Sequence, residues 1–442
     1  MALSKNVKKL ILMICVTVGC LIIYRLGAFI KMPFVRIQSS QLGTEALFGF
    51  LDVFTGGALS NFSVLCLGIS PYITASIVVQ LLQMDIVPIL KEWTEEGEEG
   101  KQKLNQLTKY IAIALAFIQG LTVTVGLKMS YGDYYFDVTA MPSNIFLFVY
   151  LSLVATAGTA FSLWLAEKIT RHGVGNGSSM LIVAGILASF PNMVGDLIRT
   201  FLRKTITASD GTVSDNETFN VFIFILVIFL LIVIILGVVF MEGAKRIIPV
   251  QYANRPSTAQ FRGKNDSNIP VKLNSASVIP VIFAATLMSL PTTVLSLVGA
   301  DTTKGFAHVL HMIFTNTEPI GFAVYILLIF LFSFFYSFLQ MNPEQMAENL
   351  QKNNAYVPGI RPGEETASYI SRVLFKITMI GATYLSLVAA LPIIMKWVIP
   401  NLPSSVSIGG TSIIIIIGVA LETVKQMKTT VQEQQYRGFL DK

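Results

Sequence analysis

Few side chains in this sequence have the types and spacing that chemistry would need. His308 and His311 stand three residues apart and could share one helical face, but no cysteine or third histidine lies nearby to complete a metal site. The glycine-rich run 173–177 lacks the Lys-Ser/Thr pair of a phosphate-binding loop, so a tight turn explains it better. The three cysteines lie in apolar segments without metal-ligand spacing, and an odd number argues against a disulfide framework. We therefore expect no enzyme, no metal site and no cofactor.

One arginine lies in an unusual local sequence. Arg361 is the only charged residue of PGIRPG, where two prolines and two glycines favour a rigid turn. A guanidinium group suits planar recognition of carboxylate or phosphate groups. Local physics leaves two roles open for this arginine, which are docking of a cytoplasmic partner and simple fixation of membrane topology or anionic lipid.

The elements that must position these residues are apolar and long. The chain has 442 residues, of which 53% are hydrophobic and only 13% charged, with a mean hydropathy of +0.66. Soluble domains carry about 25% charged residues, so the composition indicates an all-α polytopic membrane protein. Ten apolar stretches are predicted to span the membrane, at residues 10–29, 62–82, 110–127, 145–166, 176–195, 219–241, 275–299, 319–341, 377–394 and 408–421.

The distribution of basic residues predicts the orientation of these spans. With the N-terminus inside, most of the 32 lysines and arginines fall in cytoplasmic segments, so both termini are expected in the cytoplasm. The basic, then apolar, N-terminal segment resembles a signal peptide, but it has no clear small-x-small cleavage site, and we interpret it as an uncleaved first span. Two cytoplasmic loops are long, at about 242–274 and 342–370.

Residues 46–82 form an apolar stretch that is too long for one span. The stretch carries a single charged residue, Asp52, and as one helix it would measure about 55 Å, whereas the hydrocarbon core is only about 30 Å thick. Gly56–Gly57 and Ser60–Asn61 divide it into a short weak element and a full span. Irregular backbone at membrane depth is tolerated only inside protein or beside a water-filled cavity. The sequence therefore predicts an internal cavity with a short element folded into it.

Several blocks of this sequence, in chain order, resemble the SecY family, whose members are the central subunits of the bacterial Sec translocon. The blocks are FTGGALSNFSVLCLGISPYITASIVVQLL, RHGVGNGSSMLIVAGI, RIIPVQYANR, IPVKLNSASVIPVIFA, NPEQMAENLQKNNAYVPGIRPGEETASYISRVL and GGTSIIIIIGVALETVKQM. The resemblance covers the chain from end to end. It implies a channel for unfolded secretory polypeptides, with ten transmembrane helices in two pseudo-symmetric five-helix halves around a central pore, at residues 1–200 and 201–442.

The resemblance also implies roles for particular residues. A ring of apolar side chains would seal the pore at Ile69, Ile73, Ile182, Ile186, Ile282 and Ile415. A plug at about residues 47–60 would include Leu47, Phe48, Phe50, Leu51, Val53, Phe54, Gly56 and Gly57. Two of the isoleucine pairs are four residues apart, so each pair occupies one helical face. Taken alone, such isoleucines would more often serve packing, and the motif match reverses that preference.

The family also implies partners and a location. Arg361, Arg255, Lys245 and Arg246 match basic loops that engage cytoplasmic partners, although the loop around Asn254 is less densely basic than in many relatives. The implied partners are the motor ATPase SecA, the ribosome, the small membrane subunits SecE and SecG, the translocating polypeptide with its signal peptide, and membrane lipid. The implied location is the plasma membrane of a bacterium. A lateral gate between the second/third and seventh/eighth helices would release transmembrane segments into lipid.

Other classes of membrane protein fit the residues less well. A secondary transporter also uses broken helices, but it would be expected to place charged or strongly polar groups at the midplane, where these spans offer mainly isoleucine, glycine and scattered hydroxyls. An intramembrane enzyme lacks a nucleophile and a base. Within the family, an accessory export system is the nearest alternative, and the motifs favour the general one.

Overall fold

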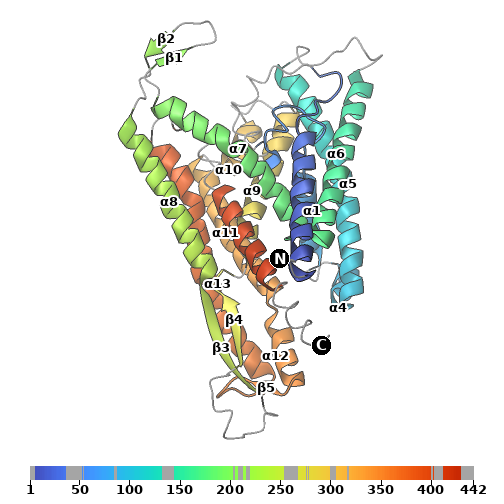
Figure 1. Ribbon diagram of the computed structural model, residues 1–442, viewed down its shortest axis with the longest axis vertical. Coiled ribbons are helices and arrows are strands. Elements are labelled where there is room, and N and C mark those ends of the chain that lie inside the picture. Colours follow the sequence, from blue (N-terminus) through green and yellow to red (C-terminus); the bar gives the residue numbers. More distant parts are fainter. Residues whose placement is uncertain are drawn as a thin grey trace.

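The computed structural model is a bundle of helices with two small sheets (Figure 1). It describes residues 5–35, 52, 54–83, 87–131, 144–202, 205–207, 213–215, 220–252, 267–274, 276, 278–298, 305–315, 318–399, 402 and 412–429. The helices are α1 (Lys5–Gly27), α3 (Ser70–Leu82), α4 (Pro88–Glu95), α5 (Glu98–Tyr131), α6 (Asn144–His172), α7 (Gly177–Phe201), α8 (Val221–Gly243), α9 (Ile279–Val298), α10 (Gly305–Phe314), α11 (Pro319–Gln340), α12 (Pro343–Lys352), α13 (Glu364–Val398) and a final helix at residues 412–429.

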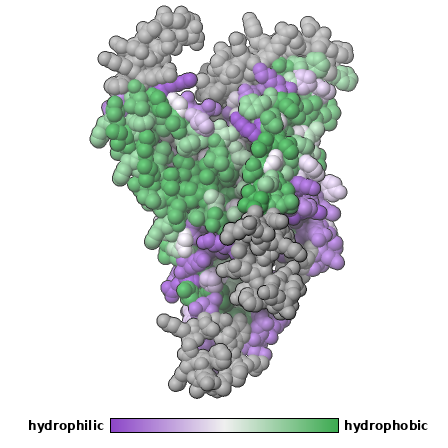
Figure 2. All heavy atoms as spheres, in the orientation of Figure 1, coloured by the Kyte–Doolittle hydropathy of each residue, from purple (hydrophilic) through white to green (hydrophobic). Residues whose placement is uncertain are grey.

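A helix lies at each of the ten predicted spans. Among the described residues, seven helices are long and apolar enough to cross a membrane, and they correspond to α1, α5, α6, α7, α8, α11 and α13. The other three predicted spans are occupied by α3, α9 and the final helix. Figure 2 shows the apolar surface as a broad band over the upper and middle part of the molecule, with hydrophilic residues gathered below it. This banding is what burial in lipid requires.

The predicted second span, residues 62–82, begins as a helix only at Ser70. The residues before it form a series of turns, in which Gly68 has a left-handed φ of 51° and donates its N–H to the Leu65 carbonyl at 2.9 Å. Pro71 then occupies the first turn of α3, where its missing N–H costs nothing. As a helix of 13 residues, α3 is only about 20 Å long, which is less than the thickness of the hydrocarbon core. The irregular backbone before α3 therefore completes the predicted second span.

The turns before α3 are held by the neighbouring elements. The N–H of Met32, after α1, donates to the Phe62 carbonyl at 3.0 Å, and the N–H of Val64 donates to the Ile30 carbonyl at 2.9 Å. On the other side α6 lies so close that a Cβ at Gly158 would meet the Val64 carbonyl oxygen at 2.0 Å. The irregular backbone is therefore enclosed by protein, as its predicted depth in the membrane demands.

Two small antiparallel sheets lie at opposite ends of the bundle (Figure 1). Strands β1 (Thr205–Thr207) and β2 (Val213–Asp215) form one of them. The other has the order β4-β3-β5, with β3 at Lys245–Tyr252, β4 at Ser267–Lys272 and β5 at Ala355–Tyr356. The long loop at 242–274 thus contains a hairpin that the charge pattern did not predict. Its strand β3 also pairs with β5 from the second long loop, through Tyr252 and Ala355.

Candidate functional site

The six isoleucines predicted for the pore ring meet in one hydrophobic cluster, which we call the central cluster. Ile69, Ile182, Ile186 and Ile415 are buried members, and Ile73 and Ile282 pack against them while half-buried. They come from α3 and the residue before it, from α7, from α9 and from the final helix. Both halves of the chain therefore contribute to a single buried apolar group.

Local structure fixes the direction of these side chains. Ile69 is the N-cap residue of α3, and its carbonyl accepts the N–H of Ile73 at 3.2 Å, so the two side chains are one turn apart. In α7, Ile182 and Ile186 are also one turn apart, and both are buried. In the final helix, Ile414 and Ile415 are both buried in the central cluster, so the isoleucine run presents more than one residue to it.

The beginning of α7 is fixed by polar contacts with its neighbours. Asn176 caps α7, with its side chain accepting the Ser178 N–H at 3.1 Å. The N–H of Gly177 donates to the Thr170 hydroxyl at 2.9 Å, and the N–H of Val174 donates to the Thr17 hydroxyl at 2.9 Å. The glycine-rich run is thus the tight turn that the sequence predicted, and it holds the helix that carries Ile182 and Ile186.

Part of the predicted plug lies against the central cluster. Phe54 is a buried member of the cluster, and Gly56 and Gly57 follow it with left-handed φ values of 69° and 82°. These conformations favour glycine, so the glycine pair turns the chain away from the cluster. The predicted plug residues Leu47, Phe48, Phe50, Leu51 and Val53 lie outside the described residues.

The plug segment rests on a glycine of α7. A Cβ at Gly185 would meet the Phe54 carbonyl oxygen at 2.1 Å and the Phe54 carbonyl carbon at 2.9 Å. In return, a Cβ at Gly56 would meet the Gly185 carbonyl oxygen at 2.9 Å. The two backbones are therefore in direct contact, at a point between Ile182 and Ile186 on α7.

Two charged side chains hold this segment. The Arg25 guanidinium at the end of α1 donates to the Gly56 carbonyl, and it also lies 4.8 Å from the centre of the Phe29 ring. The Asp52 carboxylate accepts the Ser60 N–H at 2.7 Å and the Ser60 hydroxyl. Asp52 and Ser60 thus close the segment on itself, and Arg25 fastens it to α1.

The sequence did not predict that Arg25, Asp52 and Gly185 contact the predicted plug segment. Arg25 stood out only as a charged residue near the end of an apolar span, and Asp52 only as the single charge of its stretch. These two isolated charges in apolar surroundings were the available signal, because such groups need polar partners inside the protein. Gly185 gave no signal, since a helical glycine does not reveal what packs on it.

The predicted cytoplasmic residues divide between the sheet and a turn. Lys245 and Arg246 begin β3, whereas Arg255 lies outside the described residues. Arg361 is exposed in the turn between β5 and α13, where Gly359 and Gly363 have φ values of 82° and 103°. The Thr366 hydroxyl donates to the Arg361 carbonyl at 2.7 Å, which holds the backbone of this turn.

The two long loops form one apolar unit beneath these charges. Ile248 of β3, Val271 of β4 and Val357 after β5 are buried in one cluster with Leu374 and Ile377 of α13. Ile360 packs against the same cluster. The structure therefore brings the turn that displays Arg361 together with the strand that begins with Lys245 and Arg246, although they are far apart in the sequence.

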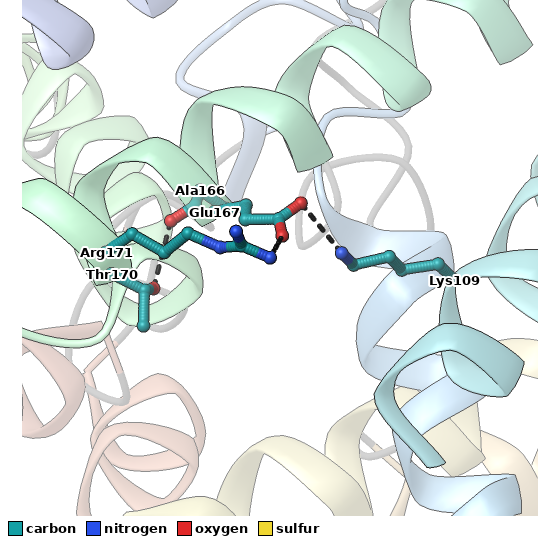
Figure 3. A network of polar contacts seen from close by, with 5 residues as sticks. All are labelled: Lys109, Ala166, Glu167, Thr170 and Arg171. Carbon is teal, nitrogen blue, oxygen red and sulfur yellow. Dashed lines mark hydrogen bonds and ion pairs between the residues drawn. The ribbon is translucent and has the colours of Figure 1, made fainter. Parts of the chain in front are cut away.

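A polar network joins α5 to α6 (Figure 3). The Lys109 ammonium lies 2.7 Å from one carboxylate oxygen of Glu167, and the Arg171 guanidinium lies 2.5 Å from the other. The side chains of Lys109 and Glu167 are about one-third exposed. Because Lys109 belongs to α5 and Glu167 to α6, the pair fastens the two helices together.

Comparisons with known proteins agree with this architecture. A family profile described as SecY matches residues 63–424. The "Protein translocase subunit SecY" of Halalkalibacterium halodurans is 43% identical over 426 residues, which are 96% of this chain and 95% of the relative. The protein of the same description from Bacillus subtilis is 41% identical over 428 residues, with 96% and 95% coverage.

Solved structures share the fold. A structure described as that of "a protein conducting channel" superposes with a TM-score of 0.63 at 18% identity, covering 95% of this chain and 92% of that one. Sec61 in the canine ribosome-channel complex from the endoplasmic reticulum superposes with a TM-score of 0.60 at 17% identity and the same coverage. With the family profile and the two bacterial relatives, these matches show that the chain belongs to the SecY family.

Proposed function

We propose that this chain moves unfolded secretory polypeptides through a pore sealed by the six isoleucines of the central cluster. As a member of the SecY family, it is a protein-conducting channel and not an enzyme. The observation that carries the pore assignment is the meeting of Ile69, Ile73, Ile182, Ile186, Ile282 and Ile415, from both halves of the chain, in one cluster.

Isoleucine side chains suit this task for two reasons. A narrow constriction lined only by branched alkyl groups excludes water and ions. Such groups also have no fixed hydrogen-bond partners, so they can close around any residue of a passing polypeptide without selecting its sequence. The central cluster supplies this apolar lining from four helical segments.

The segment around Phe54 would complete the seal as part of a plug. Phe54 belongs to the central cluster, and its backbone rests on Gly185. The described polar contacts of the segment include Arg25 with the Gly56 carbonyl and Asp52 with Ser60. A short element held in this way can leave without unfolding the helices around it, and the residues 47–60 would move as the plug.

A seam between two halves would serve as a lateral gate. The proposed halves are residues 1–200 and 201–442, and Ile77 of α3 is buried with Val281 and Phe283 of α9 across their boundary. Opening the seam would let a hydrophobic segment of the substrate leave for lipid. The gate would lie between α3 and α5 on one side and α9 and α11 on the other.

The exposed basic groups would receive cytoplasmic partners. Lys245, Arg246 and Arg361 belong to one sheet-and-turn unit that projects from the bundle. The structural relatives include channels bound to ribosomes. We infer that the ribosome or the motor ATPase SecA drives transport through this chain, with SecE and SecG as membrane subunits. Both termini would face the cytoplasm, and the membrane would be the bacterial plasma membrane.

Cysteine crosslinking tests the pore. Each of the six isoleucines is replaced by cysteine in turn, and a stalled secretory chain with one cysteine is held in the reconstituted channel. We expect crosslinks at all six positions, because a polypeptide in the pore must pass within reach of the ring. Val227→Cys is the control, since Val227 is buried in a different cluster, formed by α7, α8 and the end of α13. Crosslinks at position 227 and not at the six positions would overturn the pore assignment.

A further inference from the structure

A polar cavity of about 670 Å³ opens beside the central cluster, with walls from α3, α5, α6 and the beginning of α7. Tyr72, Leu163 and Ala166 line its apolar side. Leu163 and Ala166 are buried members of the central cluster, and Tyr72 packs against it. The cavity therefore borders the same apolar cluster to which the proposed ring belongs.

One wall of this cavity is a polar face of α5. Four polar residues of α5 line the cavity, and they form two i, i+4 pairs, Gln102 with Gln106 and Asn105 with Lys109. Such spacing places them on one helical face. Lys109 is engaged by Glu167. Within the described part of the chain, the carboxamides of Gln102, Asn105 and Gln106 have no hydrogen-bond partner.

Three adjacent carboxamides have the chemistry of the peptide group itself. Each offers an N–H donor pair and a carbonyl acceptor, and none carries a charge. They can therefore pair with the N–H and C=O groups of an extended polypeptide whatever its side chains are. We propose that this face of α5 is a binding site for the main chain of the polypeptide that enters the pore, a proposal that rests on the function proposed above.

The dimensions of the face define how much chain it holds. The rise from residue 102 to residue 109 along the helix is about 10 Å, and an extended chain advances about 3.3 Å per residue. The face therefore contacts about three residues of substrate. The Lys109–Glu167 ion pair, at 2.7 Å, holds α5 against α6. It would keep this polar face of α5 in place during successive rounds of translocation.

A cysteine reporter across the cavity tests the proposal. Ser178 lines the cavity from α7, and Ser178→Cys is made in a chain whose exposed native cysteine, Cys15, is changed to serine. Single cysteines are placed at successive positions of a stalled secretory chain in the reconstituted channel. We expect crosslinks to position 178 over about three successive substrate residues, with equal yield whether those residues have alanine, serine or valine neighbours.

Removal of the carboxamides should weaken the site. In Gln102→Ala/Asn105→Ala/Gln106→Ala, the crosslink yield should fall about tenfold or more, because each lost hydrogen bond contributes a factor of about 2 to 10. The control exchanges the two amides, as Gln102→Asn/Asn105→Gln/Gln106→Asn, and should keep most of the yield. The proposal would be wrong if the alanine variant gave an unchanged crosslink yield, or if the yield depended on the side chains of the substrate. The polar face of α5 would then simply be solvated.

The same preparations separate this proposal from the function on which it rests. If the stalled chain still crosslinks at Ile69→Cys while the alanine variant leaves the yield at position 178 unchanged, only the main-chain site is wrong. If the stalled chain crosslinks at neither place in the native background, the pore assignment fails as well.

Discussion

At the scale of single residues, the proposed seal would depend on a missing side chain as much as on the isoleucines. Gly185 lies between Ile182 and Ile186 on α7, and its missing Cβ leaves the space that the Phe54 carbonyl occupies. Protein interiors are too closely packed to absorb an added methyl group at such a contact without movement. We expect the segment around Phe54 to shift, because α7 is held by its cap and by packing.

Gly185→Ala should therefore make the channel leak. The new Cβ would stand 2.1 Å from the Phe54 carbonyl oxygen, so the segment must lift from α7, while alanine favours the helix itself by about 1 kcal/mol over glycine. We expect ion conductance of the resting channel in planar bilayers to rise several-fold without loss of folded protein.

Gly195→Ala is the matched control for this substitution. It makes the same change in the same helix, but nothing lies within 4 Å of the added Cβ. Its conductance should equal that of the native channel. Equal conductance of the two variants would show that the Phe54–Gly185 contact does not seal the pore.

At the scale of elements, the sequence predicted where ten helices lie but not where the helix of the second span begins. The apolar residues 62–69 have the composition of a span, and only the left-handed Gly68, Pro71 and the contacts from Met32 and Gly158 show that they are turns. The last two contacts are tertiary, and no local pattern encodes them. The prediction that the six isoleucines lie together came from the matched family motifs. Their apolar character alone would have fitted ordinary helix packing equally well.

The hairpin β3–β4 was missed for a different reason. Its loop was interpreted by its charges, although Ile248 and Val250 alternate with outward-facing neighbours in the pattern of a half-buried strand. Pairing of β3 with β5 could not be foreseen, since about a hundred residues separate them. This pairing is what gives the Arg361 turn a fixed support.

Arg361→Glu should block transport that is driven from the cytoplasm. The Arg361 side chain is exposed, and its backbone carbonyl accepts the Thr366 hydroxyl. We therefore expect charge reversal to change the proposed docking surface and not the fold. Reversal at an interface costs a few kcal/mol, and we expect partner-driven export into vesicles to fall at least about tenfold. Assembly with SecE, measured by co-purification, should persist.

Lys352→Glu provides the control for Arg361→Glu. It makes the same change of charge on α12, at an exposed lysine whose partner is Glu348 in the preceding turn. Export should remain near the native rate in this variant. If Arg361→Glu exported normally, or if both variants failed alike, a specific docking role for Arg361 would be wrong.

At the scale of the whole molecule, the proposed lateral gate requires two halves that are held together and can still separate. The central cluster joins residues of both halves, and the α3–α9 seam adds a second apolar contact through Ile77, Val281 and Phe283. In the proposed gate, contacts within one half would be kept when the seam opens. Contacts across the seam would favour the closed state, so we expect their strength to set how readily a substrate segment reaches lipid.

Ile77→Ala should therefore lower the hydrophobicity that a segment needs to leave the channel sideways. Truncating this buried side chain removes about 2 kcal/mol or more of packing from the closed seam, which shifts the ratio of open to closed seam about 30-fold. The measurement is the fraction of test segments of graded leucine content recovered in the membrane. Leu151→Ala is the control, because Leu151 is fully buried in a cluster formed entirely by residues 1–200. An equal shift in both variants would mean that general destabilisation, and not the seam, sets the threshold.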